Sequence, residues 1–213
     1  MLELLRALLA RRTDVALPNA SGADGVSAHV IVGALAGASR RIGKDPLVLD
    51  REETERLRAA AIDWPVAARV DELWRVAVLL RAACRGDFER LVADVYRGGD
   101  SDERRAVLRA LPLLAVPERF AALAADACRT SVLPIFEAIA CENPFPARHL
   151  SALHFNQMVL KALFLDVSLA RVLGLDGRRT PELTRMARDY AQERRAAGRA
   201  VSAELAALAE GSS

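Results

Sequence analysis

Apolar residues recur every three or four positions along most of this chain, which is the spacing of an amphipathic α-helix. The clearest case is the range 67–85, where one face carries Val70, Leu73, Trp74, Ala77, Leu80 and Cys84. No segment shows a convincing alternation of apolar and polar residues, the mark of a half-buried strand. The pattern predicts an all-α protein.

Caps and turn formers divide the chain into successive helices. Asp50 and Glu53 have the spacing of a capping box, and Thr180-Pro181-Glu182 supplies a cap, a first-position proline and an early carboxylate. These signals predict helices over 1–12, 27–41, 50–61, 67–85, 87–96, 101–111, 117–129, 131–142, 151–164, 181–198 and 202–209, and a short one near 168–173. Short connections indicate antiparallel neighbours.

Helical hairpins of this kind predict one domain over residues 1–213, built as an antiparallel array. Within it, 1–26 is an N-terminal helix and loop, and 200–213 is a C-terminal helix with a frayed tail. The Leu-Pro pairs at 111–112 and 133–134 hint at a repeat, but no motif recurs three times at fixed spacing. A HEAT-like right-handed superhelix and an irregular globular array both remain open.

The composition fits a protein with a substantial core, because 52% of the residues are hydrophobic. The 30 basic and 28 acidic side chains nearly cancel and leave a net charge of +2. That balance does not favour binding to nucleic acid, which depends on neutralising phosphates.

The cysteines and the apolar runs bear on location. Cys84, Cys128 and Cys141 lack the paired spacing of a zinc site or a redox motif, which agrees with a reducing compartment. The longest run without an acidic or basic residue, 25–39, has 15 residues, fewer than the roughly 18 of a membrane span. We expect a cytoplasmic protein without a transmembrane segment.

Polar side chains interrupt the apolar pattern of the helix at 151–164. His154, Gln157 and Lys161 share an arc of roughly 60° on that helix, whereas Asn156 lies apart. The simpler interpretation is that the arc faces water and Asn156 satisfies a backbone group. The alternative is a ligand site.

Arg194 stands on the apolar face of the helix at 181–198, close in sequence to Tyr190. A buried guanidinium needs a carboxylate, so we predict an ion pair from Arg194 to Glu142 or Glu137. A structural link between helices is favoured over anion binding, since a paired arginine keeps fewer donors for a ligand.

The segment Glu142-Asn143-Pro144-Phe145-Pro146 breaks a helix, because proline disfavours helical geometry in the residue before it. We expect an extended segment after Asn143. Phe145, held between two prolines, either lines a pocket or plugs the core, and the plug is the commoner outcome.

Signatures of common catalysis are absent from the sequence. His149 and His154 are five residues apart, which does not place two imidazoles on one helical face for zinc. There is no glycine-rich phosphate loop, no GxSxG elbow and no acidic DDxxD helix. No catalytic residue, metal site or cofactor is predicted.

Several strings of residues resemble the EboA family, densely from about residue 71 to 199. They are Arg129-Thr130-Ser131, Phe136-Glu137-Ala138-Ile139-Ala140, Asn143-Pro144-Phe145-Pro146-Ala147, Asn156-Gln157-Met158-Val159-Leu160-Lys161-Ala162, Gly174-Leu175-Asp176, Tyr190-Ala191-Gln192-Glu193-Arg194 and Ala196-Ala197-Gly198-Arg199. The resemblance implies a bacterial protein, encoded in a small gene cluster that moves secondary-metabolite precursors from the cytoplasm toward the periplasm.

Three hypotheses for the function follow. The first is a non-enzymatic binding or adaptor protein whose partner is a small metabolite or another protein of the gene cluster. Its candidate binding residues are Asn143, His154, Asn156, Gln157, Lys161, Tyr190 and Arg194. The second is an enzyme with Lys161 as base or nucleophile, assisted by His154 or Glu142. The third is a structural subunit of a multiprotein assembly.

Overall fold

The computed structural model describes residues 1–18, 27–60 and 68–211. Helices make up most of these ranges, and the β-structure found in them is one isolated bridge between Pro46 and Arg69. The prediction of an all-α protein is confirmed. The helices group into two compact units, Met1–Leu123 and Ala124–Ser213. The single domain and the HEAT-like superhelix stay predictions.

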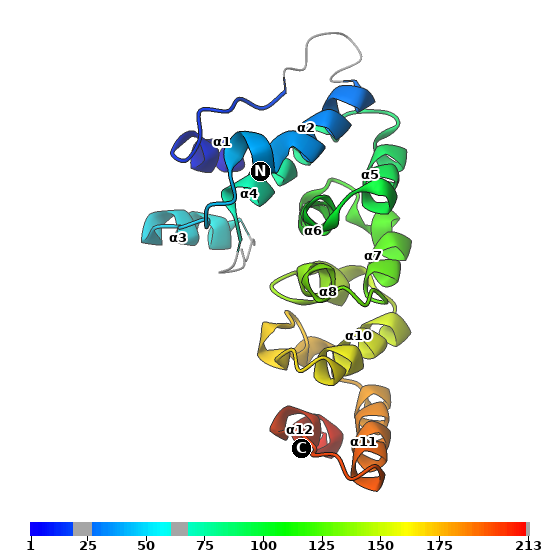
Figure 1. Cartoon of the computed structure of the whole chain (residues 1–213). Helices are drawn as coiled ribbons and strands as arrows, with labels where there is room; N and C mark the ends of the chain where they lie inside the picture. The colour runs from blue at the N-terminus through cyan, green and yellow to red at the C-terminus, as the bar shows by residue number, and fades with distance from the viewer. Residues whose placement is uncertain (19–26, 61–67, 212–213) are drawn as a thin grey trace. The chain divides into compact units, whose positions relative to one another are not determined.

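The first unit is built around one buried helix. Its helices are α1 (Leu2–Ala10), α2 (Ala28–Ile42), α3 (Arg51–Ala59), α4 (Val70–Ala82), α5 (Phe88–Gly98) and α6 (Ser101–Ala110), followed by the 3-10 turns η1 (Leu111–Leu113) and η2 (Pro117–Phe120) (Figure 1). Helix α4 packs against α1, α2 and α6. Nearly all of its side chains are buried, which explains its strong apolar pattern.

A buried ionic network joins α4 to α2. Arg75 donates to the Asp71 carboxylate at 2.6 Å and to the Leu35 carbonyl at 3.0 Å, and the Ser39 hydroxyl lies 2.8 Å from the same carboxylate. Burial alone would raise the pKa of Asp71, but hydrogen bonds from Arg69, Arg75 and Ser39 outweigh it and lower that pKa to about 2. Asp71 is therefore held ionised in the core.

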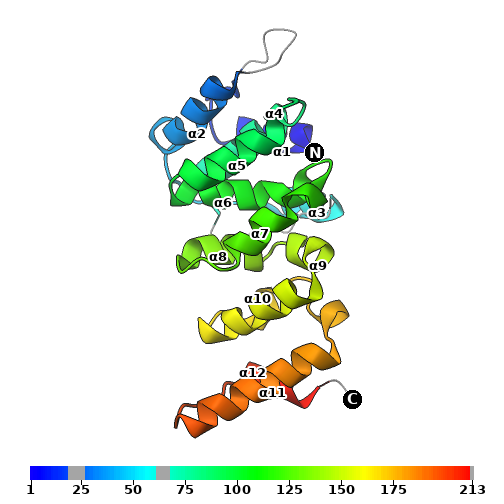
Figure 2. The same cartoon turned by 90° about the vertical axis from the view of Figure 1, so that its right-hand side faces the viewer.

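The second unit continues from α7 (Ala121–Ala127), which spans the boundary between the units. Its further elements are α8 (Leu133–Ala140), α9 (Phe145–His149), α10 (Ala152–Phe164), η3 (Leu169–Arg171), η4 (Asp176–Arg178), α11 (Pro181–Ala196) and α12 (Ala203–Glu210). Helices α8, α10 and α11 follow one another as layers (Figure 2). Helix α10 thus has a neighbour on two sides.

The cap signals predicted the helix starts well. Asp50 and Glu53 form the capping box in both directions, and the Thr180 hydroxyl accepts from the Leu183 N–H at 3.1 Å. Such bonds satisfy donors that the helix cannot satisfy itself, so local sequence decides where the helix begins.

The extended segment predicted after Asn143 is wrong, because Phe145–His149 forms helix α9. Proline restricts the residue before it, and Pro144 itself has helical angles, with φ −76° and ψ −10°. Asn143 accepts from the Phe145 N–H at 3.0 Å and so starts the new turn. Phe145 is wholly buried, as expected of a core plug.

Two further properties of the described ranges concern helix hydropathy and the cysteines. No helix there combines the length and the hydropathy that a membrane crossing requires. None of the three cysteines, which all lie in these ranges, forms a disulfide: Cys84 is exposed, whereas Cys128 and Cys141 are buried. Burial raises the pKa of the Cys128 thiol to about 12.

Candidate functional site

Lys161 reaches from α10 to the segment that follows α7. Its ammonium donates to the carbonyl of Cys128 at 3.0 Å and to that of Thr130 at 2.5 Å. It also lies 5.3 Å from the centre of the Phe136 ring, within the range of a cation–π interaction. The carbonyls after a helix carry partial negative charge and lack intrahelical donors. Lys161 thus fastens α10 to the α7–α8 connection.

The choice of lysine at this position is informative. The chain has 30 basic residues, and Lys44 and Lys161 are its two lysines. An ammonium is a compact charge with three donors, whereas a guanidinium is a planar fork. Burial lowers the pKa of Lys161, and the Cys128 thiol opposes that change. Two converging carbonyls suit the compact group.

Asn156 faces the other side of α10. It is buried, and its Nδ2 lies 3.9 Å from the sulfur of Met186 on α11. The contact is with a thioether, a weak acceptor, and not with the backbone group that the sequence suggested. Helical spacing had separated Asn156 from Lys161, and the structure confirms that they meet different neighbours.

Asn143 is also buried, in the turn between α8 and α9. Its amide donates to the Ala138 carbonyl at 2.9 Å, while its oxygen accepts from Phe145. The side chain therefore organises the turn. Asn143, Asn156 and Lys161 do not converge on one surface, because each is bonded to a different part of the second unit.

One side of α10 is turned away from its neighbours. Leu153 and Phe164 are 58% and 62% exposed, Gln157 is exposed, and Leu160 is half-buried. These four residues recur at i, i+4, i+7 and i+11, and we call them the outer face of α10. His154 is half-buried beside it. Gln157 is the predicted site residue that lies fully on this face.

The predicted carboxylate partner of Arg194 is wrong. Arg194 donates to the Ala200 carbonyl at 2.7 Å and to the Tyr190 hydroxyl at 3.1 Å. It lies in the last turn of α11, where the carbonyls at the end of the helix attract a cation. The side chain is half-exposed, so the premise of a buried charge also fails.

Arg171 binds the two carboxylates instead. Its Nε lies 2.7 Å from Glu142 and its Nη1 lies 2.5 Å from Glu137. These bonds, that to Glu142 above all, raise the pKa of the Arg171 guanidinium. Sequence reasoning missed Arg171 because it lies in the 3-10 turn η3, outside any amphipathic pattern. The sequence signal that could have pointed to Arg171 is the pair of acids at the end of α8, which need a basic partner.

Two of the cavities lined by described residues lie in the first unit. One encloses about 240 Å³ between α1, residues 13–17 and Arg81 of α4. The other encloses about 250 Å³ beside Phe88 and Phe120. Neither includes a residue predicted for a site. The sequence does contain a signal that could have pointed to Arg81: it is the one charged residue in the otherwise apolar run 76–84.

Comparison with known proteins adds one finding. A family model described as metabolite traffic protein EboA matches residues 18–210, nearly the whole chain. No curated protein and no solved structure matches the chain.

Proposed function

The chain belongs to the EboA family of metabolite traffic proteins, and we propose that it serves this traffic as a non-enzymatic adaptor that docks another protein. The proposal places it in the cytoplasm, where free thiols persist, on a route toward the periplasm. The observation that carries it is the outer face of α10, where the exposed apolar side chains of Leu153 and Phe164 lie on either side of Gln157 and Leu160.

The contacts of Lys161 favour an adaptor over an enzyme. A base or nucleophile must reach its substrate, but two donors of this ammonium are already bound to Cys128 and Thr130. The lowered pKa is the observation that favours the enzymatic alternative, since burial activates lysines in this way. The hydrogen bonds favour the opposite state, a charged and structural ammonium.

The outer face of α10 has the dimensions of a helix-binding surface. From Leu153 to Phe164 it runs about 16 Å at 1.5 Å per residue, or three turns. Partner helices and grooves recognise anchors at this spacing, whereas small ligands prefer concave sites. The segment bound by Lys161 leads directly into Val132 and Leu133, which are also exposed. A protein encoded in the same cluster is the proposed occupant.

A double substitution tests this docking surface. Leu153→Ser with Phe164→Ser removes the two most exposed anchors, and we expect about tenfold weaker binding to the partner. Each protein of the cluster is tagged and co-purified with the native chain and with the variant, and precursor export is measured in a host lacking the native gene. Val48→Ser, at a 74% exposed position of the first unit, is the matched control.

The result decides between the readings. The adaptor is supported if the double variant loses both co-purification and export while the Val48→Ser control keeps both. Unchanged binding and export would contradict it. A variant that still binds its partner but no longer supports export would favour an enzyme, to be followed by Lys161→Arg. A fixed ratio to the partner in native mass spectrometry would favour a permanent structural subunit.

A further inference from the structure

The cavity between α1 and α4 contains an arginine without a partner. The Arg81 side chain is half-buried, its Nε is fully buried, and that atom meets no acceptor. Among the buried and half-buried arginines of the described ranges, Arg81 is the one whose guanidinium makes no hydrogen bond or ion pair. Buried polar groups are nearly always satisfied, and this guanidinium lines a cavity without an acceptor from the protein, so its charge is available to a ligand there.

Apolar and polar side chains share the walls of the cavity. Leu9 of α1 is buried and contributes one wall, and Val15 and Leu17 contribute another. Trp74 donates its indole N–H to the Val15 carbonyl at 3.2 Å and holds this segment in place. The volume equals about eight water molecules at roughly 30 Å³ each, so the cavity suits a compact molecule.

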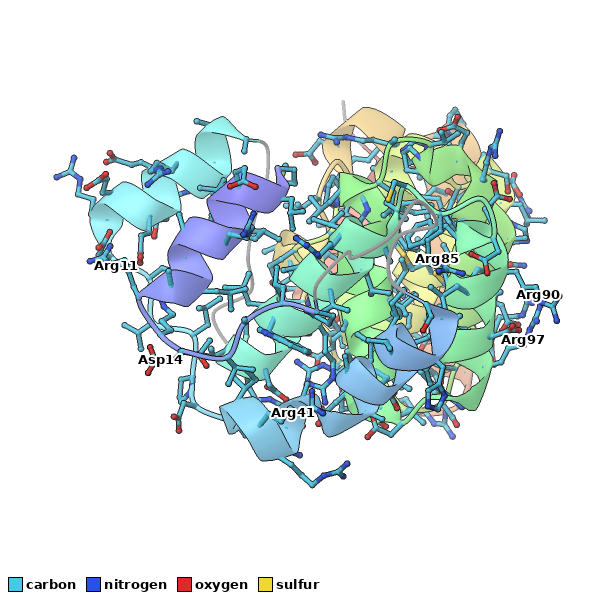
Figure 3. All side chains as sticks on the ribbon, turned by 90° about the horizontal axis from the view of Figure 1, so that it is seen from above. Arg11, Asp14, Arg41, Arg85, Arg90 and Arg97 are labelled. Atoms are coloured by element: carbon cyan, nitrogen blue, oxygen red, sulfur yellow. The ribbon has the colours of Figure 1, made fainter. Side chains whose placement is uncertain are left out.

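The charges around the cavity favour an anion. Arg6 lines it together with Arg81, and the Arg6 guanidinium forms a surface ion pair with Glu3 at 3.0 Å. Asp14 is the one carboxylate among the lining residues. In Figure 3 its side chain points outward from the 13–17 segment, away from α1. The balance of the lining side chains is one positive charge.

The second cavity provides a contrast. Its arginines, Arg85 and Arg119, are paired with Asp87 at 2.7 Å and with Glu89. These guanidiniums have carboxylate partners in the protein itself. The first cavity alone of the two offers a free guanidinium beside apolar walls.

We propose that the cavity between α1, residues 13–17 and Arg81 binds a compact organic carboxylate. The two Nη groups at the end of a guanidinium present two parallel donors that match the two oxygens of a carboxylate. The hydrocarbon part of the ligand lies against Leu9, Val15 and Leu17. This site is separate from the outer face of α10 and does not rest on the docking proposal.

Benzoate is the probe, and ¹H–¹⁵N NMR of the full chain is the measurement. Benzoate is titrated at constant ionic strength, with benzyl alcohol as the neutral isostere and inorganic phosphate as the anion without an apolar body. We expect saturable shifts of the Trp74 indole N–H and of the Val15 and Leu17 amides with benzoate. The other two probes bind at least about tenfold more weakly.

Two variants and a control separate charge from shape. Arg81→Met removes the guanidinium, and Ala10→Phe fills the cavity from an exposed position while keeping Arg81. Both are expected to weaken benzoate binding about tenfold or more. Arg148→Met, at an exposed arginine of the second unit, leaves binding unchanged.

Several outcomes would overturn the proposal. They are the absence of saturable shifts in the native chain, equal binding by benzyl alcohol, and equal benzoate binding by Arg81→Met. Phosphate binding as tight as benzoate would overturn the assignment to an organic carboxylate. If either variant fails to fold, the comparison of the three probes on the native chain still decides.

Discussion

Lys161 shows how one side chain can be both conspicuous in sequence and structural in role. Its position among Phe155, Met158 and Leu160 suggested chemistry, yet its donors are directed at two main-chain carbonyls. Cation and carbonyl meet at the end of a helix, where each stabilises the other. Charge within an apolar pattern therefore marks a fixed geometry as readily as a reactive group.

Replacing this lysine tests the structural role. Lys161→Met leaves the Cys128 and Thr130 carbonyls without their donor, so we expect the free energy of unfolding to fall by about 1–2 kcal/mol. Gln157→Met, on the exposed face of the same helix, is the control and should change it by less than about 0.5 kcal/mol. Urea denaturation measures both. Equal stability of the two variants would contradict the role.

At the same scale, contacts between residues far apart in sequence were the hardest to predict. The sequence paired Arg194 with Glu137 or Glu142, whereas the arginine that binds these two acids is Arg171. Burial pattern identifies a residue that needs a partner. It does not choose between candidates on different turns, because that choice depends on how helices pack.

Among the elements, one connection of the second unit requires a glycine. Gly174 has φ +74°, in the left-handed region, and a Cβ there would lie 2.7 Å from the Cβ of Ala147. Ala147 belongs to α9, so this contact sets how closely the turn near η4 approaches that helix. Only glycine combines that angle with that distance.

A pair of alanine substitutions tests this approach. Gly174→Ala adds both backbone strain and a clash, and we expect it to lower the free energy of unfolding by about 1–3 kcal/mol. At Gly177, three residues on, φ lies outside the left-handed region and a Cβ would meet nothing within 4 Å. Gly177→Ala should be neutral or slightly stabilising. Thermal unfolding of the two variants that gave the same midpoint would refute the argument.

Helices were predicted well and the connections less well, for a physical reason. A helix start depends on caps such as Asp50 and Thr180, which act within four residues. The turn at Asn143 depends on a side chain that bonds both preceding and following backbone, and no periodicity encodes that. The sequence therefore predicted where α8 ends but not that α9 follows.

At the scale of the whole molecule, the described carboxylates that are buried and have a strongly lowered pKa lie in the first unit. Hydrogen bonding to Arg12 lowers the pKa of Glu53 to about 2, and Asp71 has the same value for the reasons given above. The site residues proposed from sequence all lie in the second unit, whereas the cavities beside Arg81 and beside Phe88 lie in the first. The division into units was not foreseen, since it depends on contacts among helices.

This distribution predicts that acid weakens the first unit first. Both carboxylates have folded pKa values below their unfolded values near 4, so their stabilisation is complete above that pH and is lost as the pH falls toward 2. Each carboxylate contributes about 2 kcal/mol to the free energy of unfolding, and about half or more of that contribution is lost by pH 3. Hydrogen exchange at pH 7 and pH 3, corrected for intrinsic rates, should show α4 losing more protection than α10.

Neighbouring glutamates supply the control for that prediction. Glu53→Gln should flatten the acid dependence of α3 and its contacts, because the titrating group is gone. Glu52→Gln changes an exposed residue one position earlier and should leave the dependence intact. Equal loss of protection in α4 and α10 of the native chain would show that the network does not control acid stability.

The arrangement of the three thiols makes Cys84 a ready-made attachment point. Cys128 and Cys141 are shielded in the core, whereas Cys84 lies in the turn after α4, three residues beyond Arg81. A maleimide dye would therefore couple at a single position of the unaltered chain. That position adjoins Ala83 and Arg85, which line the second cavity, so the emission of one fluorophore could report events in the first unit without any engineered cysteine.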